Sequence, residues 1–235
     1  MRAIPPGLAG MINEGDPVQP RPSSSVLLLR GRSPWRVLLV RRPRDVDFAP
    51  GAHVFPGGSV HPEDLAFEDP LRAAALREVF EEVGVLIGRT SRGPAGPTHS
   101  ARLRERLAAG TGWRAALADE GVELSPGRLV PLTRWITPER IVRRFDTHFF
   151  LARMPSRQEV VPGPAEIVDW LWARPVEALG DPRLSLVHAT RRILESVAGE
   201  DDSSRLIGKA RRRRRVPIVR PRVVEASGGW LIVEE

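Results

Sequence analysis

The chain has 235 residues, of which 41% are hydrophobic and 28% charged, a balance typical of a globular protein with one sizeable core. It contains no cysteine, which excludes disulfides and thiolate metal sites. No apolar run reaches membrane-spanning length, and residues 1–22 lack the apolar core of a secretion signal. We therefore expect a cytoplasmic protein that makes no membrane contact.

The formal net charge of +7 is distributed unevenly. Nine positive residues and no acidic one lie between positions 205 and 222, so the rest of the chain carries about −2. Five of the nine are the consecutive arginines 211–215. Such a run is usually a solvated, mobile segment. The alternative is a segment that attracts RNA, an anionic surface or an acidic partner through counterion release.

The first half of the chain combines predicted strands with one well-defined helix. Residues 1–22 are expected to be flexible. Apolar, β-branched segments then predict two strands separated by a Gly-Arg-Ser-Pro turn, at 23–30 and 36–42. A helix follows at 70–83. We interpret residues 88–127, which are rich in Gly, Pro, Arg and Ala, as an insertion or cap without a core of its own, with helical stretches at 99–109 and 112–120.

The second half returns to strands, and strands interleaved with helices predict an α/β fold with helices on both faces of a sheet. Three further strands are expected at 128–136, 147–153 and 166–172, before a helix at 184–197. The main domain would cover residues 23–200, followed by a basic C-terminal extension at 201–235. Within that extension, residues 216–233 alternate enough for one or two short strands that pair with the body or with a second subunit.

The helix at 70–83 can be read from its ends. Asp69 is a favourable N-cap, and Pro70 fits the first helical position. Gly84 lies where a left-handed residue commonly ends a helix. An apolar stripe at helical spacing predicts the buried side of this helix, made of Leu76, Val79, Phe80 and Val83.

The same helix carries three glutamates at i, i+3 and i+4, which places Glu78, Glu81 and Glu82 on one face. Three like charges this close repel one another. A hard divalent cation such as Mg²⁺ or Mn²⁺ would remove the repulsion, because it binds carboxylate oxygens. The alternative is a solvated helix face on which Arg77 pairs with Glu81. The glycines of Phe55-Pro56-Gly57-Gly58, just upstream, favour metal, because they let the backbone approach a ligand closely.

Together, Phe55-Pro56-Gly57-Gly58 and Arg77-Glu78-Val79-Phe80-Glu81-Glu82-Val83-Gly84-Val85 resemble the signature of the Nudix hydrolases, which cut nucleoside diphosphates linked to another moiety. We call the signature segment from Gly58 to Val85 the box. The 18 residues between its Gly58 and Arg77 exceed the usual spacing. Counted back from Arg77, the lone glutamate position of the signature holds Asp69.

The long spacing is itself a mark of one group within the family. Two further segments, Trp135-Ile136-Thr137-Pro138 and Arg144-Phe145-Asp146-Thr147-His148-Phe149-Phe150, make residues 24–195 similar to the nucleoside diphosphate-linked moiety X motif 19 group. Animal members of this group are coenzyme A diphosphatases. The resemblance implies a Nudix-type α/β/α sandwich with a mixed β-sheet, to which the helical insertion and the basic tail are added.

The resemblance also implies roles for individual residues. Glu78, Glu81 and Glu82 would bind the metal, together with the carbonyl group of Gly58. Arg77 would orient a glutamate through a charge-assisted bond. Two acidic residues elsewhere are candidates for an extra carboxylate that activates water, namely Glu139 and Glu166.

Arginine pairs are candidates for gripping substrate phosphates, with a plain surface role as the alternative. Neighbours on a strand point to opposite faces, so at most one member of each pair faces the site. The pairs are Arg41 with Arg42 and Arg143 with Arg144. We select Arg42 and Arg144, and add Phe55, as candidate substrate-binding residues.

Coenzyme A or acyl-coenzyme A is the expected substrate. One departure is Asp47, which stands where another coenzyme A-cleaving Nudix group has an arginine. The first alternative is therefore another nucleotide-linked diphosphate, such as ADP-ribose or NADH. A second alternative is a non-catalytic module that binds RNA through the arginine-rich tail, although the three retained box glutamates argue against it. We also expect a homodimer, because many relatives are dimers.

Overall fold

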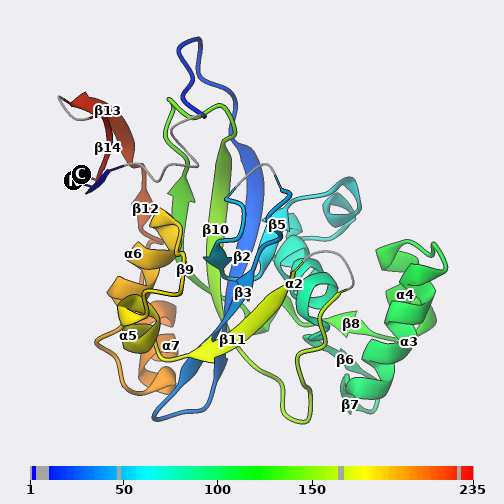
Figure 1. The fold of residues 1–235 in the computed structure, drawn as a ribbon. Coiled ribbons are helices and arrows are strands. Elements are labelled where there is room, and N and C mark those ends of the chain that lie inside the picture. Colours follow the sequence, from blue (N-terminus) through cyan, green and yellow to red (C-terminus); the bar gives the residue numbers. More distant parts are fainter. Residues whose placement is uncertain (1, 4–10, 47–48, 164–166, 227–228, 235) are drawn as a thin grey trace.

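The computed structural model describes residues 2–3, 11–46, 49–163, 167–226 and 229–234 (Figure 1). Its elements in chain order are β1 (Arg2–Ala3), β2 (Arg21–Arg30), β3 (Arg36–Arg41), β4 (His53–Val54), β5 (Gly57–Ser59), η1 (Pro62–Ala66), α2 (Pro70–Val83), β6 (Gly88–Thr90), β7 (Gly93–Pro94), α3 (Pro97–Ala108), α4 (Trp113–Asp119), β8 (Glu123–Leu124), η2 (Pro126–Arg128), β9 (Val130–Ile136), β10 (Phe145–Arg153), β11 (Asp169–Ala173), α5 (Pro175–Gly180), α6 (His188–Val197), α7 (Ser203–Arg211), β12 (Ile218–Val219), β13 (Arg222–Ala226) and β14 (Gly229–Val233).

A mixed sheet of eight strands forms the centre of the molecule. Its main path has the order β11-β3-β2-β10-β9-β12, while β4 pairs with β3 and β5 with β2. Strands β2 and β10 run parallel over nine register pairs. The β12–β9 pair is also parallel, whereas the remaining neighbours are antiparallel. The expected mixed sheet is therefore confirmed.

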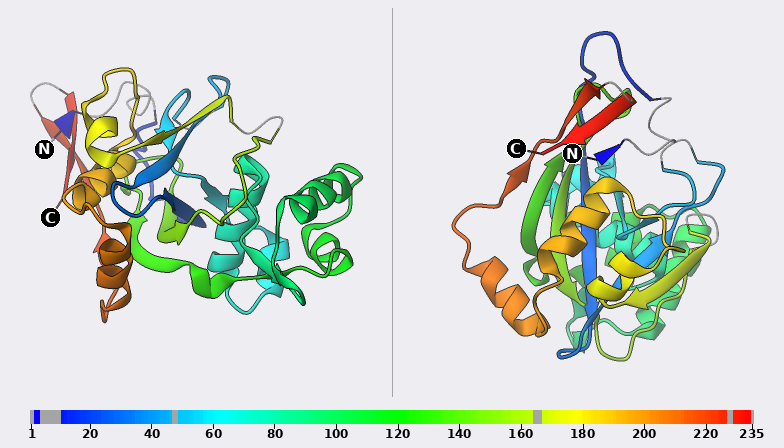
Figure 2. Two further views of the ribbon diagram at one scale, coloured as in Figure 1. Left: turned by 90° about the horizontal axis from the view of Figure 1, so that it is seen from below. Right: turned by 60° about the vertical axis from the view of Figure 1, so that its left-hand side comes forward.

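Side chains that alternate along the central strands fill two separate cores. In β2, Leu27 and Leu29 pack with residues of α5, α6 and α7. Val26 and Leu28 point to the other face and pack against α2. Helices therefore cover both faces of the sheet, as Figures 1 and 2 show. This arrangement confirms the α/β/α sandwich.

The insertion shares a small core with the helix that precedes it. Leu103 of α3 and Trp113 of α4 are buried there together with Phe80 of the box helix α2. The centroids of the Phe80 and Trp113 rings lie 5.3 Å apart. The Glu63 carboxylate also accepts a bond from the Trp113 backbone N–H at 3.0 Å. The insertion is therefore anchored to the segment that contains the box.

The arginine-rich segment is more ordered than the mobile tail that we expected. Helix α7 buries Leu206, Ile207 and Ala210 against the sheet. Strand β12 pairs with β9, and the β13–β14 hairpin pairs with β1. The C-terminal strands thus find partners within the chain, and the homodimer remains a prediction. Among the described residues, no helix has both the length and the apolar character needed to cross a bilayer.

One predicted helix begins later than expected. Residues 184–187 are extended, because the His53 N–H donates to the Ser185 carbonyl at 2.7 Å and His53 forms a bridge with Leu186. Helix α6 therefore begins at His188. The bond to a distant strand overrides a helical pattern that is visible in the local sequence. Strand β11 likewise begins at Asp169, and Glu166 lies outside the described residues.

Replacing Leu206 by alanine tests the packing of α7. We expect Leu206→Ala to lower the free energy of unfolding by about 2 to 5 kcal/mol, because it removes a buried side chain from the core. The exposed Arg212→Ala, in the next turn, should change it by less than about 0.5 kcal/mol. Urea denaturation followed by circular dichroism would measure both values. Equal effects would show that α7 does not pack as described.

Candidate active site

Helix α2 has the ends that its sequence predicts. The Asp69 carboxylate accepts a bond from the Arg72 N–H, and Gly84 adopts a left-handed conformation with φ of 67°. Leu76, Val79 and Val83 are buried beside the sheet. Phe80 instead faces the insertion. The helix is therefore enclosed on two sides, and its glutamate face lies against β5.

Strand β5 brings two glycines close to that face. A Cβ atom on Gly57 would lie 2.3 Å from the Ser24 carbonyl oxygen, and one on Gly58 would lie 2.4 Å from Oε1 of Glu78. Gly57 therefore requires glycine, because it meets backbone atoms and has a φ of 156°, whereas a side chain at Gly58 would displace the Glu78 carboxylate. Ser25 fixes the same loop, because its hydroxyl donates to the Pro56 carbonyl at 2.9 Å. The predicted close approach of this backbone is present, and the group it approaches is a box carboxylate.

The Arg77 guanidinium is the centre of the site. It is almost fully buried and donates through Nη1 to Glu78 at 3.0 Å and to Glu81 at 2.6 Å. Through Nη2 it also donates to the Ser59 carbonyl, at 2.9 Å. Burial alone lowers the pKa of Arg77, but its bond to Asp64 and the charges of Glu78 and Glu81 raise that pKa above its usual value. The group is permanently charged.

Asp64 is the fourth acceptor, and sequence reasoning missed it. It is fully buried in η1 and pairs with Arg77 at 3.0 Å. Counting back from Arg77 had pointed to Asp69, which caps the helix and pairs with Arg72 instead. Counting forward from Gly58 with the usual spacing reaches Asp64. The extra residues of the long box therefore lie between this acid and the helix.

The three box glutamates gather around Arg77 and β5. Glu78 and Glu81 share one guanidinium nitrogen, whereas Glu82 accepts a bond from the Gly57 N–H at 2.9 Å. Their oxygens are the donors that Mg²⁺ and Mn²⁺ prefer. Across the described residues, however, no three His, Asp or Glu side chains surround a common point as metal ligands would. Carboxylate oxygens are suitable ligands for a hard cation, but Glu78 and Glu81 are bonded to Arg77.

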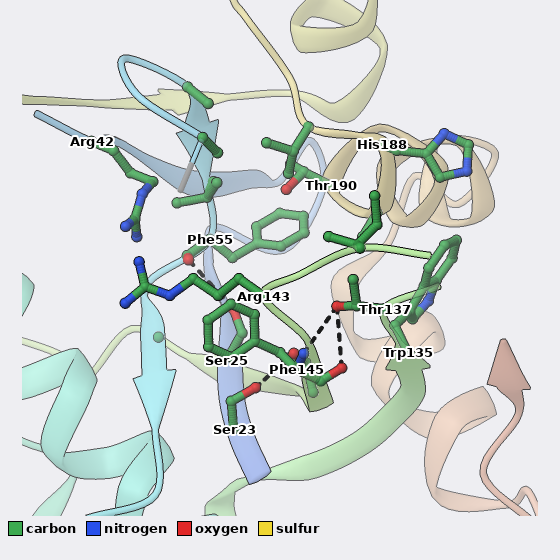
Figure 3. Close-up of a pocket in the computed structure, with 18 of the residues that line it drawn as sticks. Ser23, Ser25, Arg42, Phe55, Trp135, Thr137, Arg143, Phe145, His188 and Thr190 are labelled. Atoms are coloured by element: carbon green, nitrogen blue, oxygen red, sulfur yellow. Dashed lines mark hydrogen bonds between the residues drawn. The ribbon is translucent and has the colours of Figure 1, made fainter. Parts of the chain in front are cut away.

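A cavity of about 910 Å³ adjoins the other side of β5 (Figure 3). Its walls include Gly57, Gly58 and Ser59, so the backbone of β5 separates it from the glutamate helix. Arg42 and Arg143 line the cavity, and in Figure 3 both guanidinium groups point toward the same side of it. Arg21 also lines the cavity, and Asp45 is the acidic residue among its lining residues, so positive charge is in excess close to the box.

The rest of the cavity is largely apolar. The Phe55 and Phe149 rings pack edge to face with their centroids 6.3 Å apart. The Trp135 and His188 rings pack in the same way, with centroids 6.0 Å apart. The far wall comes from distant parts of the chain, including Ile141, Val223 and Ile232. Val223 and Ile232 belong to the β13–β14 hairpin, which sequence reasoning did not place at the site. Their only signal was apolar alternation, which does not reveal a long-range position.

Only some of the residues predicted to bind substrate or to supply an extra carboxylate line the cavity. Phe55 and Arg42 line the cavity, and their role in substrate binding stays a prediction. Arg144 does not, because its buried guanidinium donates to the carbonyls of Thr137 and Val18. Its neighbour Arg143 is the member of the pair that faces the cavity. Glu139 is exposed and does not line the cavity, while Glu166 lies outside the described residues.

Comparison with known proteins decides the family, because a model of the NUDIX domain matches residues 19–197. The chain belongs to the Nudix family. This Nudix protein is 28% identical over 208 residues to the human "Acyl-coenzyme A diphosphatase NUDT19", covering 61% of this chain and 54% of that protein. It is also 28% identical to the chicken protein of that name, over 68% of this chain and 62% of the other.

A solved structure supports the fold. A NUDIX hydrolase from Alicyclobacillus acidocaldarius is 27% identical and superposes with a TM-score of 0.67, over 81% of this chain and 96% of that chain. The Nudix chain spans only 54% and 62% of the lengths of the two curated relatives.

The role of Asp64 can be tested through stability. We expect Asp64→Asn to lower the free energy of unfolding by about 3 to 5 kcal/mol, because it leaves the buried Arg77 charge without its main partner. Asp69→Asn is the matched control, since asparagine caps helices as well as aspartate does. It should cost less than about 1 kcal/mol, the usual value of an exposed ion pair. Guanidinium chloride titration would compare them, and similar losses would contradict the assignment.

Proposed function

We propose that this Nudix protein is a metal-dependent hydrolase that cleaves the diphosphate of coenzyme A or an acyl-coenzyme A. The observation that carries the proposal is a cavity with a basic side and an apolar side, joined through β5 to Glu78 and Glu82 of the box. A coenzyme thioester has the same division, with phosphates at one end and an apolar chain at the other. The names of the two relatives support this choice of substrate.

Bound Mg²⁺ or Mn²⁺ would supply Lewis acidity and a nucleophilic water at neutral pH. Glu78, Glu81 and Glu82 would hold the metal, with the Gly58 carbonyl as a further donor. Because Arg77 now bonds to Glu78 and Glu81, metal binding would compete with it for these two carboxylates. Asp64 and the Ser59 carbonyl would keep the guanidinium in place when the glutamates turn away.

Arg42 and Arg143 would bind the diphosphate oxygens at the basic side of the cavity. Guanidinium groups suit this task, because their forked donors match phosphate oxygens in pairs. Arg143 thereby takes the role that the sequence had suggested for Arg144. Glu139 is exposed, so a box glutamate is the simpler candidate for activating water.

The apolar side would receive the pantetheine and acyl portion of the substrate. Phe55, Trp135 and Phe149 line this side, together with Val223 and Ile232 of the β13–β14 hairpin. Burial of an acyl chain contributes about 0.8 kcal/mol per CH₂ group, so this wall would favour acylated over free coenzyme. We propose that the protein acts in the cytoplasm and that it forms a homodimer.

Replacing Glu82 tests the hydrolase activity. With Mg²⁺ or Mn²⁺ and coenzyme A as substrate, we expect Glu82→Gln to lower kcat by roughly 10²-fold or more, because a principal charge-stabilising group is lost. The exposed Glu105→Gln in α3 is the control and should retain the wild-type rate. Chromatography of the two phosphorylated products of coenzyme A would measure the rates of both variants. Activity that survives Glu82→Gln would reject the proposed role of the box.

A substrate panel tests the identity of the substrate. The purified protein would be offered coenzyme A, an acyl-coenzyme A, ADP-ribose and NADH under the same metal conditions. We expect the highest kcat/KM for the acylated coenzyme. Equal or faster turnover of ADP-ribose or NADH would reject the coenzyme preference while retaining diphosphatase activity.

The cavity end can be tested separately. We expect Val223→Asp to reduce the preference for a medium-chain acyl-coenzyme A over free coenzyme A by about tenfold, because a charge in an apolar wall opposes burial of the chain. Val224→Asp, the next residue on β13 and only half-buried, does not line the cavity and serves as control. The ratio of the two kcat/KM values is the measurement. An unchanged ratio in Val223→Asp would exclude β13 from substrate binding.

A further inference from the structure

A second cavity, of about 370 Å³, lies at the opposite end of the central strands. Val130 at the start of β9 and Arg153 at the end of β10 line it, whereas Ile136 and Phe145, at the other ends of these strands, line the first cavity. At about 3.3 Å per residue, the length of β9 separates the two by roughly 20 Å. The second cavity is therefore independent of the proposed active site.

Three arginines from separate elements converge on this cavity. Arg128 comes from η2, Arg153 from β10 and Arg211 from α7. The other lining residues are Val130, Ser204, Ile207 and Gly208, so no acidic residue lines it. Convergence from three elements is a property of the fold and is invisible in the local sequence.

These arginines are not neutralised by the protein. Arg153 donates to the hydroxyl groups of Ser203 and Ser204, at 3.2 and 2.8 Å. Within the described ranges, no carboxylate pairs with Arg128, Arg153 or Arg211. Elsewhere on the surface arginines do find carboxylates, as in Arg89–Glu123, Arg106–Asp119 and Arg183–Asp181. The second cavity is thus a concentration of uncompensated positive charge.

The arginine run continues this surface and is held in place. Arg213 donates through Nη1 to the Leu132 carbonyl at 3.1 Å. The Pro217 carbonyl accepts from the Thr133 hydroxyl at 3.1 Å and from the Arg134 N–H at 2.8 Å. With α7 packed on the sheet before it, the run is fixed along the β9 edge, while Arg212, Arg214 and Arg215 remain exposed.

A purely structural role accounts for only part of this charge. Lys209 and Arg211 lie in the last turn of α7, where positive charge stabilises a helix. Lys209 also pairs with Glu200 at 2.6 Å. Arg153 ends a strand, so neither explanation applies to it. Arg128 ends the three-residue helix η2, which has too few aligned peptide units to build a large dipole. Fixed like charges repel one another, and an anionic ligand would relieve that repulsion.

We propose that this basic strip, defined as Arg128, Arg153, Arg211, Arg212, Arg214 and Arg215, binds the phosphodiester backbone of a nucleic acid. These arginines extend from the second cavity along the edge of a strand. Such an arrangement suits a chain of repeated phosphate groups better than a ligand with one phosphate group. Arginine forks match phosphate oxygens. No aromatic side chain lines the second cavity, so the bases would not be stacked there and binding would not depend on sequence.

The test measures binding of a fluorescein-labelled RNA of about 20 nucleotides, long enough to cross several backbone-binding sites of the usual size. Anisotropy would be recorded with the full chain over a series of KCl concentrations. We expect the triple variant Arg128→Gln/Arg153→Gln/Arg211→Gln to reduce the slope of log affinity against log salt by roughly 2, because about 0.7 is lost per single-strand phosphate contact. The slope for DNA of the same sequence should fall equally.

The matched control removes the same charge elsewhere. Arg92→Gln/Arg102→Gln/Arg114→Gln changes three exposed arginines of the insertion segment and should leave the salt slope unchanged. The double variant Arg128→Gln/Arg211→Gln keeps the bonds of Arg153 to Ser203 and Ser204, so a smaller loss of slope with an unchanged thermal melt would exclude misfolding. Glu82→Gln, which is expected to lose hydrolysis, should bind RNA with the wild-type affinity. Failure of the nucleic-acid proposal can thereby be distinguished from failure of the hydrolase proposal.

Three results would overturn the proposal. The first is an unchanged salt slope in the triple variant, and the second is an equal loss in the control. The third is displacement of the RNA by sodium pyrophosphate at the same phosphate concentration, which would mark a site for small phosphorylated molecules.

Discussion

The buried guanidinium of Arg77 is the contact on which the arrangement of the box depends. It joins η1 through Asp64, β5 through the Ser59 carbonyl and its own helix through Glu78 and Glu81. A charge with so little access to water is tolerated only when acceptors surround it. The same bonds therefore hold the segment before the helix, the glycine strand and two of the box glutamates in fixed relation.

The central sheet connects the box at one end of its strands with the basic strip at the other end. Three consecutive serines at the start of β2 show how: Ser23 bonds to Thr147 of β10, Ser24 to the carbonyl of Leu71 in α2, and Ser25 to the loop before β5. One strand thus positions the helix, the loop and a cavity wall together. The opposite ends of β9 and β10 carry the basic strip. Two surfaces of different chemistry share one rigid scaffold.

Features set by neighbouring residues could be predicted from the sequence. The bounds of α2 follow from a cap, a proline and a glycine, and the central strands follow from their apolar composition. Features set by distant contacts could not. The pairing of Asp64 with Arg77, the orientation of Arg143 instead of Arg144 and the late start of α6 all depend on other elements. The roles of the glutamates in metal binding and catalysis remain predictions.

The far wall of the large cavity has a consequence for how the protein matures. Ile232 and Val223 contribute to that wall, and their hairpin pairs with β1 at the other end of the sequence. During synthesis, which proceeds from the N-terminus, the box helix and the strands up to β11 can form before the hairpin leaves the ribosome, whereas β12 emerges just ahead of the hairpin. The pocket is therefore completed only after residue 232 has emerged, and a nascent chain would hold its glutamates in position beside an open groove.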